Sequence, residues 1–268
     1  MSAGPARPAR PAGPAGRDSL GPLAIADLGL VPYADALALQ RTLAEERLAG
    51  RLQHDALLLL EHPPVVTLGR GTQPTSLPLD AETLRARGIE TFEIERGGDV
   101  TYHGPGQLVG YPIFDLTRHR QDLHWFLRQL EQTLILALAE LGVRAERNPG
   151  YTGVWTQGRK IASIGIHVRQ WVTWHGFALN VTTDLSPFGS IVPCGIPNVV
   201  MTSVEKEREG GRGDPRGTRS AQLSTEAKSA VARAAVHTFG FEGTLPFDPR
   251  QEGRGRRPAE ANAPPAFH

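Results

Sequence analysis

Hydrophobic and polar residues recur along the chain with two different periods, and each period predicts its own kind of element. Leucines follow one another at steps of three and four residues from Leu123 to Leu141, and Gly142 comes next, which predicts an amphipathic helix. A similar pattern predicts a helix over residues 34–49 that ends at Gly50. Two further helices are expected over residues 80–87 and 225–239, with Asp80 and Ser224 as their N-caps.

Short apolar or alternating runs without helical spacing predict β-strands. Residues 56–60 and 65–68 flank His62-Pro63-Pro64, where two prolines prevent a helix and favour an extended backbone. Helices and strands therefore mix without a steady βαβ alternation, so we expect an α+β or mixed α/β sheet rather than a doubly wound one. The other predicted strands cover residues 89–95, 108–114, 161–168 and 171–181, the last two joined by a tight turn at Arg169-Gln170.

The composition predicts a single domain between two tails. No break in composition occurs between residues 21 and 248, and a stretch rich in glycine, arginine and glutamate, residues 205–219, is expected to be a loop insertion within that domain. Residues 1–20 consist mainly of proline, alanine and glycine with scattered arginine. Such a composition cannot bury much apolar surface, so this segment and residues 249–268 are predicted to be disordered.

The overall charge gives no reason to expect a polyanionic partner. The 268 residues include 29 lysines and arginines against 28 acidic residues, so we expect no nucleic-acid partner. The longest apolar runs, residues 56–60 and 134–139, are far shorter than the ~20 residues that cross a bilayer, so no membrane association is expected. With one cysteine, no recognisable signal peptide and no possible internal disulfide, the chain is expected to be cytoplasmic.

The single cysteine is the best candidate for a nucleophile. Cys194 lies in Pro193-Cys194-Gly195-Ile196-Pro197, where glycine and prolines are expected to hold its side chain on a rigid turn. A free cysteine is more often a small buried hydrophobe than a nucleophile, so this segment alone leaves both interpretations open.

Three other segments carry candidate chemistry. Residues 96–107 place four glycines and a proline around one arginine and one histidine, which is typical of a loop that approaches a ligand or of a structural turn. The segment lacks a phosphate-loop pattern, and its single Arg-Gly-Gly unit is not the repeated RNA-binding kind. Lys160 begins an apolar strand, where it is either solvated or close enough to the thiol to favour the thiolate and move protons. The small residues within 175–181 indicate either a groove for a long thin ligand or close strand packing.

Together these segments resemble one family. With Glu61-His62-Pro63-Pro64 and Thr67-Leu68-Gly69-Arg70, they follow the order and approximate spacing of the bacterial lipoyl(octanoyl) transferases over roughly residues 22–245. The resemblance implies the fold of biotin and lipoate protein ligases, a mixed sheet flanked by helices that is distantly similar to the cores of class II aminoacyl-tRNA synthetases.

The resemblance also implies a reaction. Members take an octanoyl group from the phosphopantetheine of acyl carrier protein and hold it as a thioester on the cysteine that matches Cys194. They pass it to a lysine of a lipoyl domain, in 2-oxoacid dehydrogenase complexes or in the glycine cleavage H protein. The lysine that matches Lys160 lowers the pKa of that cysteine and acts as acid and base. Because the donor thioester is already activated, neither ATP nor a metal is expected.

The resemblance further implies which residues bind the acyl chain. Backbone N–H groups in the Gly165 strand and near Cys194 are our candidates for stabilising the oxyanion. The acyl-pocket residues that carry over are Arg96, Gly97, Gly98, Asp99, Val100, Thr101, Tyr102, His103, Ser163, Ile164, Gly165, Gly176, Phe177 and Ala178.

Three alternatives stay open at this point. An ATP-dependent lipoate or biotin ligase of the same fold needs no thiol, and Pro193-Cys194-Gly195 argues against it. A non-catalytic module that binds lipoyl domains or carrier protein would not need both Cys194 and Lys160. A cysteine hydrolase with His103 or His167 as the base lacks, in these motifs, an acid that would orient either ring.

Overall fold

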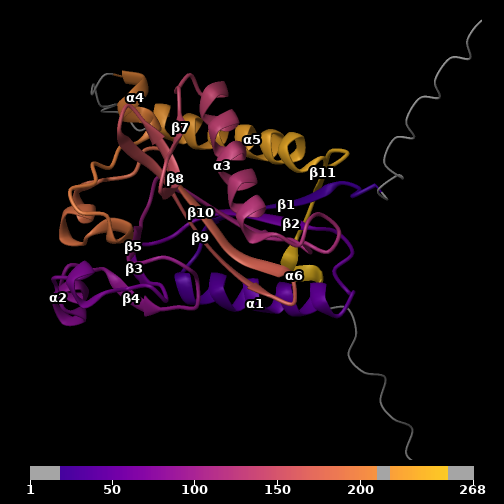
Figure 1. Ribbon diagram of the computed structural model, residues 1–268, viewed down its shortest axis with the longest axis horizontal. Coiled ribbons are helices and arrows are strands. Elements are labelled where there is room, and N and C mark those ends of the chain that lie inside the picture. The colour runs from indigo at the N-terminus through magenta and orange to yellow at the C-terminus, as the bar shows by residue number, and fades with distance from the viewer. Residues whose placement is uncertain (1–18, 210–217, 253–268) are drawn as a thin grey trace, which may run out of the picture.

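The computed structural model describes residues 19–209 and 218–252, and a mixed β-sheet runs through its centre (Figure 1). Within these residues the eight-stranded sheet has the order β11-β1-β2-β6-β10-β9-β8-β7. Strand β1 pairs in parallel with β2 and β11, and the other neighbours pair antiparallel. The strands are β1 (Leu23–Leu30), β2 (Ala56–Glu61), β6 (Gln107–Ile113), β7 (Glu146–Asn148), β8 (Tyr151–Thr156), β9 (Arg159–Arg169), β10 (Val172–Asn180) and β11 (Thr244–Pro246).

A second, three-stranded sheet lies beside the predicted loop of residues 96–107. Its order is β4-β3-β5, with β3 (Val65–Leu68) parallel to β4 (Glu90–Glu93) and antiparallel to β5 (Thr101–His103). Strand β5 lies inside the stretch that the sequence predicted to be irregular, so that expectation is wrong for these three residues.

Helices cover both faces of the large sheet (Figure 1). On one face α3 and α5 pack together through a core that includes Phe126, Leu134 and Val231. On the other face α1 packs against β6 and β10, and its Leu43 belongs to a second core cluster. The helices are α1 (Tyr33–Leu48), α2 (Ala81–Ala86), α3 (Leu123–Glu140), α4 (Val204–Glu209), α5 (Thr218–Phe239) and α6 (Pro249–Glu252), with 3₁₀ turns η1 (Pro74–Ser76), η2 (Ser186–Ser190) and η3 (Pro193–Gly195). No helix in the described ranges is long and apolar enough to cross a membrane.

Several predicted elements are confirmed. Helix α3 follows the leucine pattern, and the Asp122 carboxylate caps it by accepting the Trp125 N–H. Asp80 is the N-cap of α2, where its side chain accepts the Thr83 N–H at 2.7 Å. The fold class is also confirmed, because the sheet is mixed and helices flank it.

Helix α5 begins earlier than the sequence predicted. It starts at Thr218, so Ser224 lies inside the helix and is not its N-cap. The Ser224 hydroxyl instead donates to Glu61 Oε1 at 3.1 Å, a contact between parts of the chain far apart in sequence.

The sequence predicted a loop over residues 205–219 and disordered tails, and these predictions are wrong for the residues that the structure describes. Residues 205–209 belong to α4, in which Glu207 pairs with Arg159 at 2.7 Å and accepts the Thr202 hydroxyl. Residues 249–252 form α6, and Leu20 packs against the large core. The remainder of the predicted tails, residues 1–18 and 253–268, and residues 210–217 of the predicted loop lie outside the described residues.

Candidate active site

A pocket of about 270 Å³ opens on the face of the large sheet where β6, β9 and β10 lie side by side. Ser163 pairs with Ala178, and Ala178 pairs with Val109, so these three side chains form one row across the three strands. The pocket brings together most of the residues that the sequence singled out, namely Arg96, Gly98, Asp99, Thr101, His103, Lys160, Ser163, Ile164, Gly165, Gly176, Phe177, Ala178 and Cys194.

Cys194 occupies a strained turn that lines this pocket. It lies in η3 with φ 59° and ψ 19°, a left-handed conformation that is uncommon for a residue with a side chain. Its N–H donates to Val100 O at 2.8 Å. Gly195 follows with φ +66°, and a Cβ there would lie 2.5 Å from Asp99 Oδ2. The predicted rigid turn is therefore confirmed, and it is fixed against the loop that contains Asp99 and Val100.

The turn amides are not free to stabilise an oxyanion. The N–H groups of Cys194, Gly195 and Ile196 donate to Val100 O, Val192 O and Pro193 O at 2.8, 3.0 and 3.1 Å. These three amides are therefore already paired, which argues against them as donors to the oxyanion. The polar groups nearest the sulfur include the Ser163 hydroxyl, whose Oγ is 3.6 Å from Cys194 Sγ, a hydrogen-bonding distance for sulfur.

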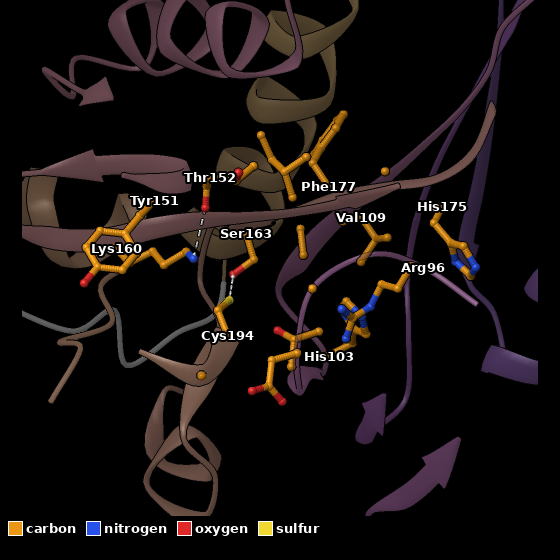
Figure 2. A pocket seen from close by; sticks show the side chains of 18 of the residues that line it. Arg96, His103, Val109, Tyr151, Thr152, Lys160, Ser163, His175, Phe177 and Cys194 are labelled. Carbon is orange, nitrogen blue, oxygen red and sulfur yellow. Dashed lines mark hydrogen bonds between the residues drawn. The ribbon is translucent and has the colours of Figure 1, made fainter. Parts of the chain in front are cut away.

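Lys160 points into the same part of the pocket. Figure 2 shows its ammonium directed toward Ser163 and Cys194. The side chain is 1% exposed, donates to Thr152 O at 3.2 Å and lies 5.5 Å from the centre of the Trp155 ring. No carboxylate of the described chain pairs with it at 4 Å or less. A buried cation without an acidic partner is costly, so a developing negative charge on the sulfur or on a substrate oxygen would find a favourable place beside it.

Arg96 is a second buried cation. Its Nη2 donates to both Thr67 O and Thr67 Oγ1 at 2.9 Å, and its Nη1 donates to Gly97 O at 3.2 Å. Burial lowers the pKa of Arg96. Gly69 of the Thr67-Leu68-Gly69-Arg70 motif leaves room for this side chain, because a Cβ at Gly69 would lie 2.8 Å from Arg96 Nη1.

Glycines bring the Arg96 loop onto the floor of the pocket. Gly97 N donates to Ile166 O of β9 at 2.9 Å. A Cβ on Gly165 would lie only 2.8 Å from Gly97 O and 3.0 Å from Arg96 Cδ. The close approach of loop and strand therefore depends on the absence of a side chain at Gly165.

Three predicted acyl-pocket residues do not line the pocket. Gly97 supports the loop as described, while Val100 accepts the Cys194 N–H and packs in a separate core with Val66. Tyr102 faces away because side chains alternate along β5, and its ring lies 5.5 Å from that of Phe188.

Other lining residues were not predicted. They include Tyr33 from α1, Val109 and Tyr111 from β6, Gly150 from the β7–β8 turn, Tyr151 and Thr152 from β8, His175 from β10, and Gly195 and Ile196 after the cysteine. The alternation of Val109 and Tyr111 within a predicted strand could have identified both as facing one side. No local pattern marks Tyr33.

The histidines do not provide a general base beside the thiol. Burial lowers the pKa of His103 to about 3 and that of His62 to about 4, so both rings are neutral near pH 7. Figure 2 places His103 on the side of the pocket away from Lys160. His167 does not line the pocket, and its Nδ1 lies 3.0 Å from Glu95 O. Among the described residues no group of three or more histidine, cysteine or acidic side chains is arranged to hold a metal ion.

Comparison with known proteins decides the family. Residues 32–213 match the family described as the lipoyl protein ligase A/B catalytic domain. The chain is 55% identical over 186 residues to the octanoyltransferase of Gloeobacter violaceus, an alignment that covers 69% of this chain and 82% of that protein. The chain belongs to the octanoyltransferase family. A second member, from Geobacter sulfurreducens, is 52% identical over 210 residues, 78% of this chain and 82% of its own length. The chain is thus an acyltransferase enzyme for octanoyl groups, as the motifs predicted.

Solved structures confirm the fold. Lipoate-protein ligase A bound with ATP superposes with a TM-score of 0.65 at 16% identity, over 87% of this chain and 92% of that one. A bipartite lipoate protein ligase from Thermoplasma acidophilum superposes with a TM-score of 0.63 at 17% identity, over 87% and 90% of the two chains. At this identity the similarity concerns the fold alone. It therefore does not favour an ATP-dependent ligase over an octanoyltransferase.

Proposed function

We propose that this octanoyltransferase moves an octanoyl group from the phosphopantetheine of acyl carrier protein, through a thioester on Cys194, to a lysine of a lipoyl domain. The observation that carries the proposal is that Cys194, Ser163 and Lys160 meet in one pocket although they come from separate segments. We take the acceptors to be the lipoyl domains of 2-oxoacid dehydrogenase complexes and the glycine cleavage H protein, and the compartment to be the cytoplasm, where a free thiol persists.

The first half of the reaction is a thioester exchange. The Cys194 thiolate attacks the octanoyl carbonyl carbon, and a new C–S bond forms as the carbonyl oxygen becomes an oxyanion. The Lys160 ammonium and the Ser163 hydroxyl receive that charge, a role supported by the contact between Ser163 and the sulfur and by the direction of the Lys160 side chain. The bond to the pantetheine sulfur then breaks, and that thiol leaves with a proton from Lys160.

The second half forms the amide. The amine of the acceptor lysine attacks the Cys194 thioester, and the now neutral Lys160 takes the proton that the amine loses. The C–S bond breaks and Cys194 leaves as a thiolate beside the restored ammonium. Because one thioester exchanges for another of similar energy and an amide is the more stable product, this scheme requires neither ATP nor a metal.

Transfer from octanoyl-carrier protein to an isolated lipoyl domain, followed by the mass of the acceptor, tests the proposal. Cys194→Ser is expected to abolish transfer, because a serine hydroxyl is not ionised at neutral pH. Lys160→Met removes the acid and base and is expected to lower the rate by roughly 10²–10⁴-fold. The control is Lys228→Met, which changes a lysine that pairs with Asp27 outside the pocket. An active Cys194→Ser enzyme would refute the covalent route, and attachment of free octanoate only with ATP would favour a ligase.

A further inference from the structure

The end of the pocket away from Lys160 is enclosed and polar. Figure 2 shows Arg96, His103 and His175 on the opposite side of Cys194 from Lys160 and Tyr151. We call this region the polar end, and each of its side chains is at most 8% exposed. It consists of Tyr33, Arg96, Thr101, His103, Tyr111 and His175.

Three polar atoms of the polar end have no hydrogen-bond partner within the described protein. They are Arg96 Nε, Thr101 Oγ1 and His175 Nε2, and the residues are 8%, 6% and 2% exposed. His175 Nε2 lies 3.9 Å from Glu95 Oε2, which is within ion-pair distance but too long for a hydrogen bond. Buried polar groups are nearly always paired in folded proteins, so three unpaired groups in one enclosed space point to a ligand that pairs with them.

The scaffold holds these three groups in place. Thr101 lies opposite Thr67 in the β3–β5 ladder, and Thr67 accepts both hydrogen bonds from Arg96 Nη2. The backbone N–H of His175 donates to Gln40 Oε1 of α1 at 2.8 Å. The unpaired atoms therefore belong to residues held by β3 and by α1, rather than to mobile surface side chains.

The polar end combines donors with acceptors. Arg96 Nε is a donor only, the Thr101 hydroxyl is both donor and acceptor, and His175 Nε2 is one or the other according to its tautomer. No carboxylate in the described part of the chain pairs with Arg96 at 4 Å or less. A hydroxyl or keto oxygen satisfies such a set, whereas a terminal methyl group leaves all three groups unpaired.

We propose that the polar end is a subsite for an oxygen-bearing terminus of the acyl chain. The enzyme then accepts medium-chain acyl groups with a hydroxyl or keto oxygen at the far end, in addition to octanoyl. The same polar groups limit the length of unsubstituted acyl chains, because a longer chain would bring its terminal methyl group against them. This inference rests on the proposed function, since it requires the acyl chain to lie in this pocket.

The experiment compares three donor thioesters on acyl carrier protein: octanoyl, 8-hydroxyoctanoyl and dodecanoyl. The measured quantity is kcat/KM for transfer to a lipoyl domain. The wild-type enzyme is expected to use 8-hydroxyoctanoyl at least as well as octanoyl, and dodecanoyl roughly tenfold or more less well. Thr101→Val preserves the side-chain volume and removes the hydroxyl, so the ratio of 8-hydroxyoctanoyl to octanoyl should fall about tenfold.

Two matched variants complete the test. Thr101→Ser keeps a hydroxyl and is expected to retain the wild-type ratio. Thr133→Val makes the same change at a buried threonine of α3, whose hydroxyl donates to Gln129 O, and is expected to leave the ratio unchanged. A wild-type ratio below about one tenth, or a ratio that Thr101→Val does not alter, would overturn the subsite. Loss of octanoyl transfer by the wild-type enzyme would instead refute the proposed function.

Discussion

Replacing Gly165 with alanine should displace the loop that carries Arg96. The new Cβ would lie 2.8 Å from Gly97 O and 3.0 Å from Arg96 Cδ. The first of these neighbours is backbone, so the loop itself must shift. The hydrogen bond from Gly97 N to Ile166 O, 2.9 Å long, holds the loop at this position and would be strained or broken.

The structure sets the size of this effect. Inserting one methyl group into a closely packed contact costs about 1–3 kcal/mol. For a chain of this size, each kcal/mol corresponds to roughly 2–4 °C in melting temperature, so we expect a fall of about 2–12 °C. Octanoyl transfer should fall further, by up to roughly 100-fold, because Arg96 moves with the loop and small displacements in an active site are costly.

Thermal unfolding and single-turnover transfer measure the two effects. Gly189→Ala is the control, since an added Cβ there meets no described atom within 4 Å. If Gly165→Ala unfolds at the same temperature as Gly189→Ala and transfers octanoyl at the wild-type rate, the loop does not depend on this contact and the account of pocket assembly is wrong.

Two further predictions concern stability. His62 and His103 have pKa values of about 4 and about 3 in the folded protein, below the ~6.5 expected in the unfolded chain. As the pH falls below about 6.5, the unfolded chain therefore binds more protons than the folded protein does. Urea unfolding should therefore show a loss of about 2 kcal/mol per histidine between pH 7.5 and pH 5, and a pH-independent stability over this range would contradict the burial of neutral rings. Glu131→Gln should lower the free energy of unfolding by about 1–3 kcal/mol, because this buried carboxylate pairs with two arginines and accepts the Gly153 N–H. Glu140→Gln, at an exposed pair, should change it little, and equal effects would show that burial is not the cause.

Local patterns predicted the features whose causes are themselves local. Leucine spacing is sufficient for α3, because one face of a helix must be apolar to pack on the sheet. The proline and glycine residues around Cys194 impose a turn whatever the surroundings, and the turn is present. Asp80 caps α2 through a hydrogen bond to a residue three positions along the chain.

The features that the sequence did not predict depend on contacts between distant segments. Ser224 has the character of an N-cap, but Glu61 accepts its hydroxyl and the helix continues through it. The Cys194 N–H donates to Val100 O, which only the folded loop brings near. Tyr33 enters the pocket from α1, a helix with no role in the motifs. The motifs thus predicted which segments meet, whereas the pairing of individual groups required the structure.

The acyl-enzyme itself is the most direct test of the central claim. Octanoyl-carrier protein is mixed with the enzyme without an acceptor, quenched in acid within one turnover, and the products are measured by intact mass and peptide mapping. We predict one octanoyl group on the peptide that contains Cys194, which disappears when a lipoyl domain is added and reappears on that domain. An enzyme that transfers octanoyl under the same conditions with no adduct, or with a transferable adduct on another residue, would contradict the account.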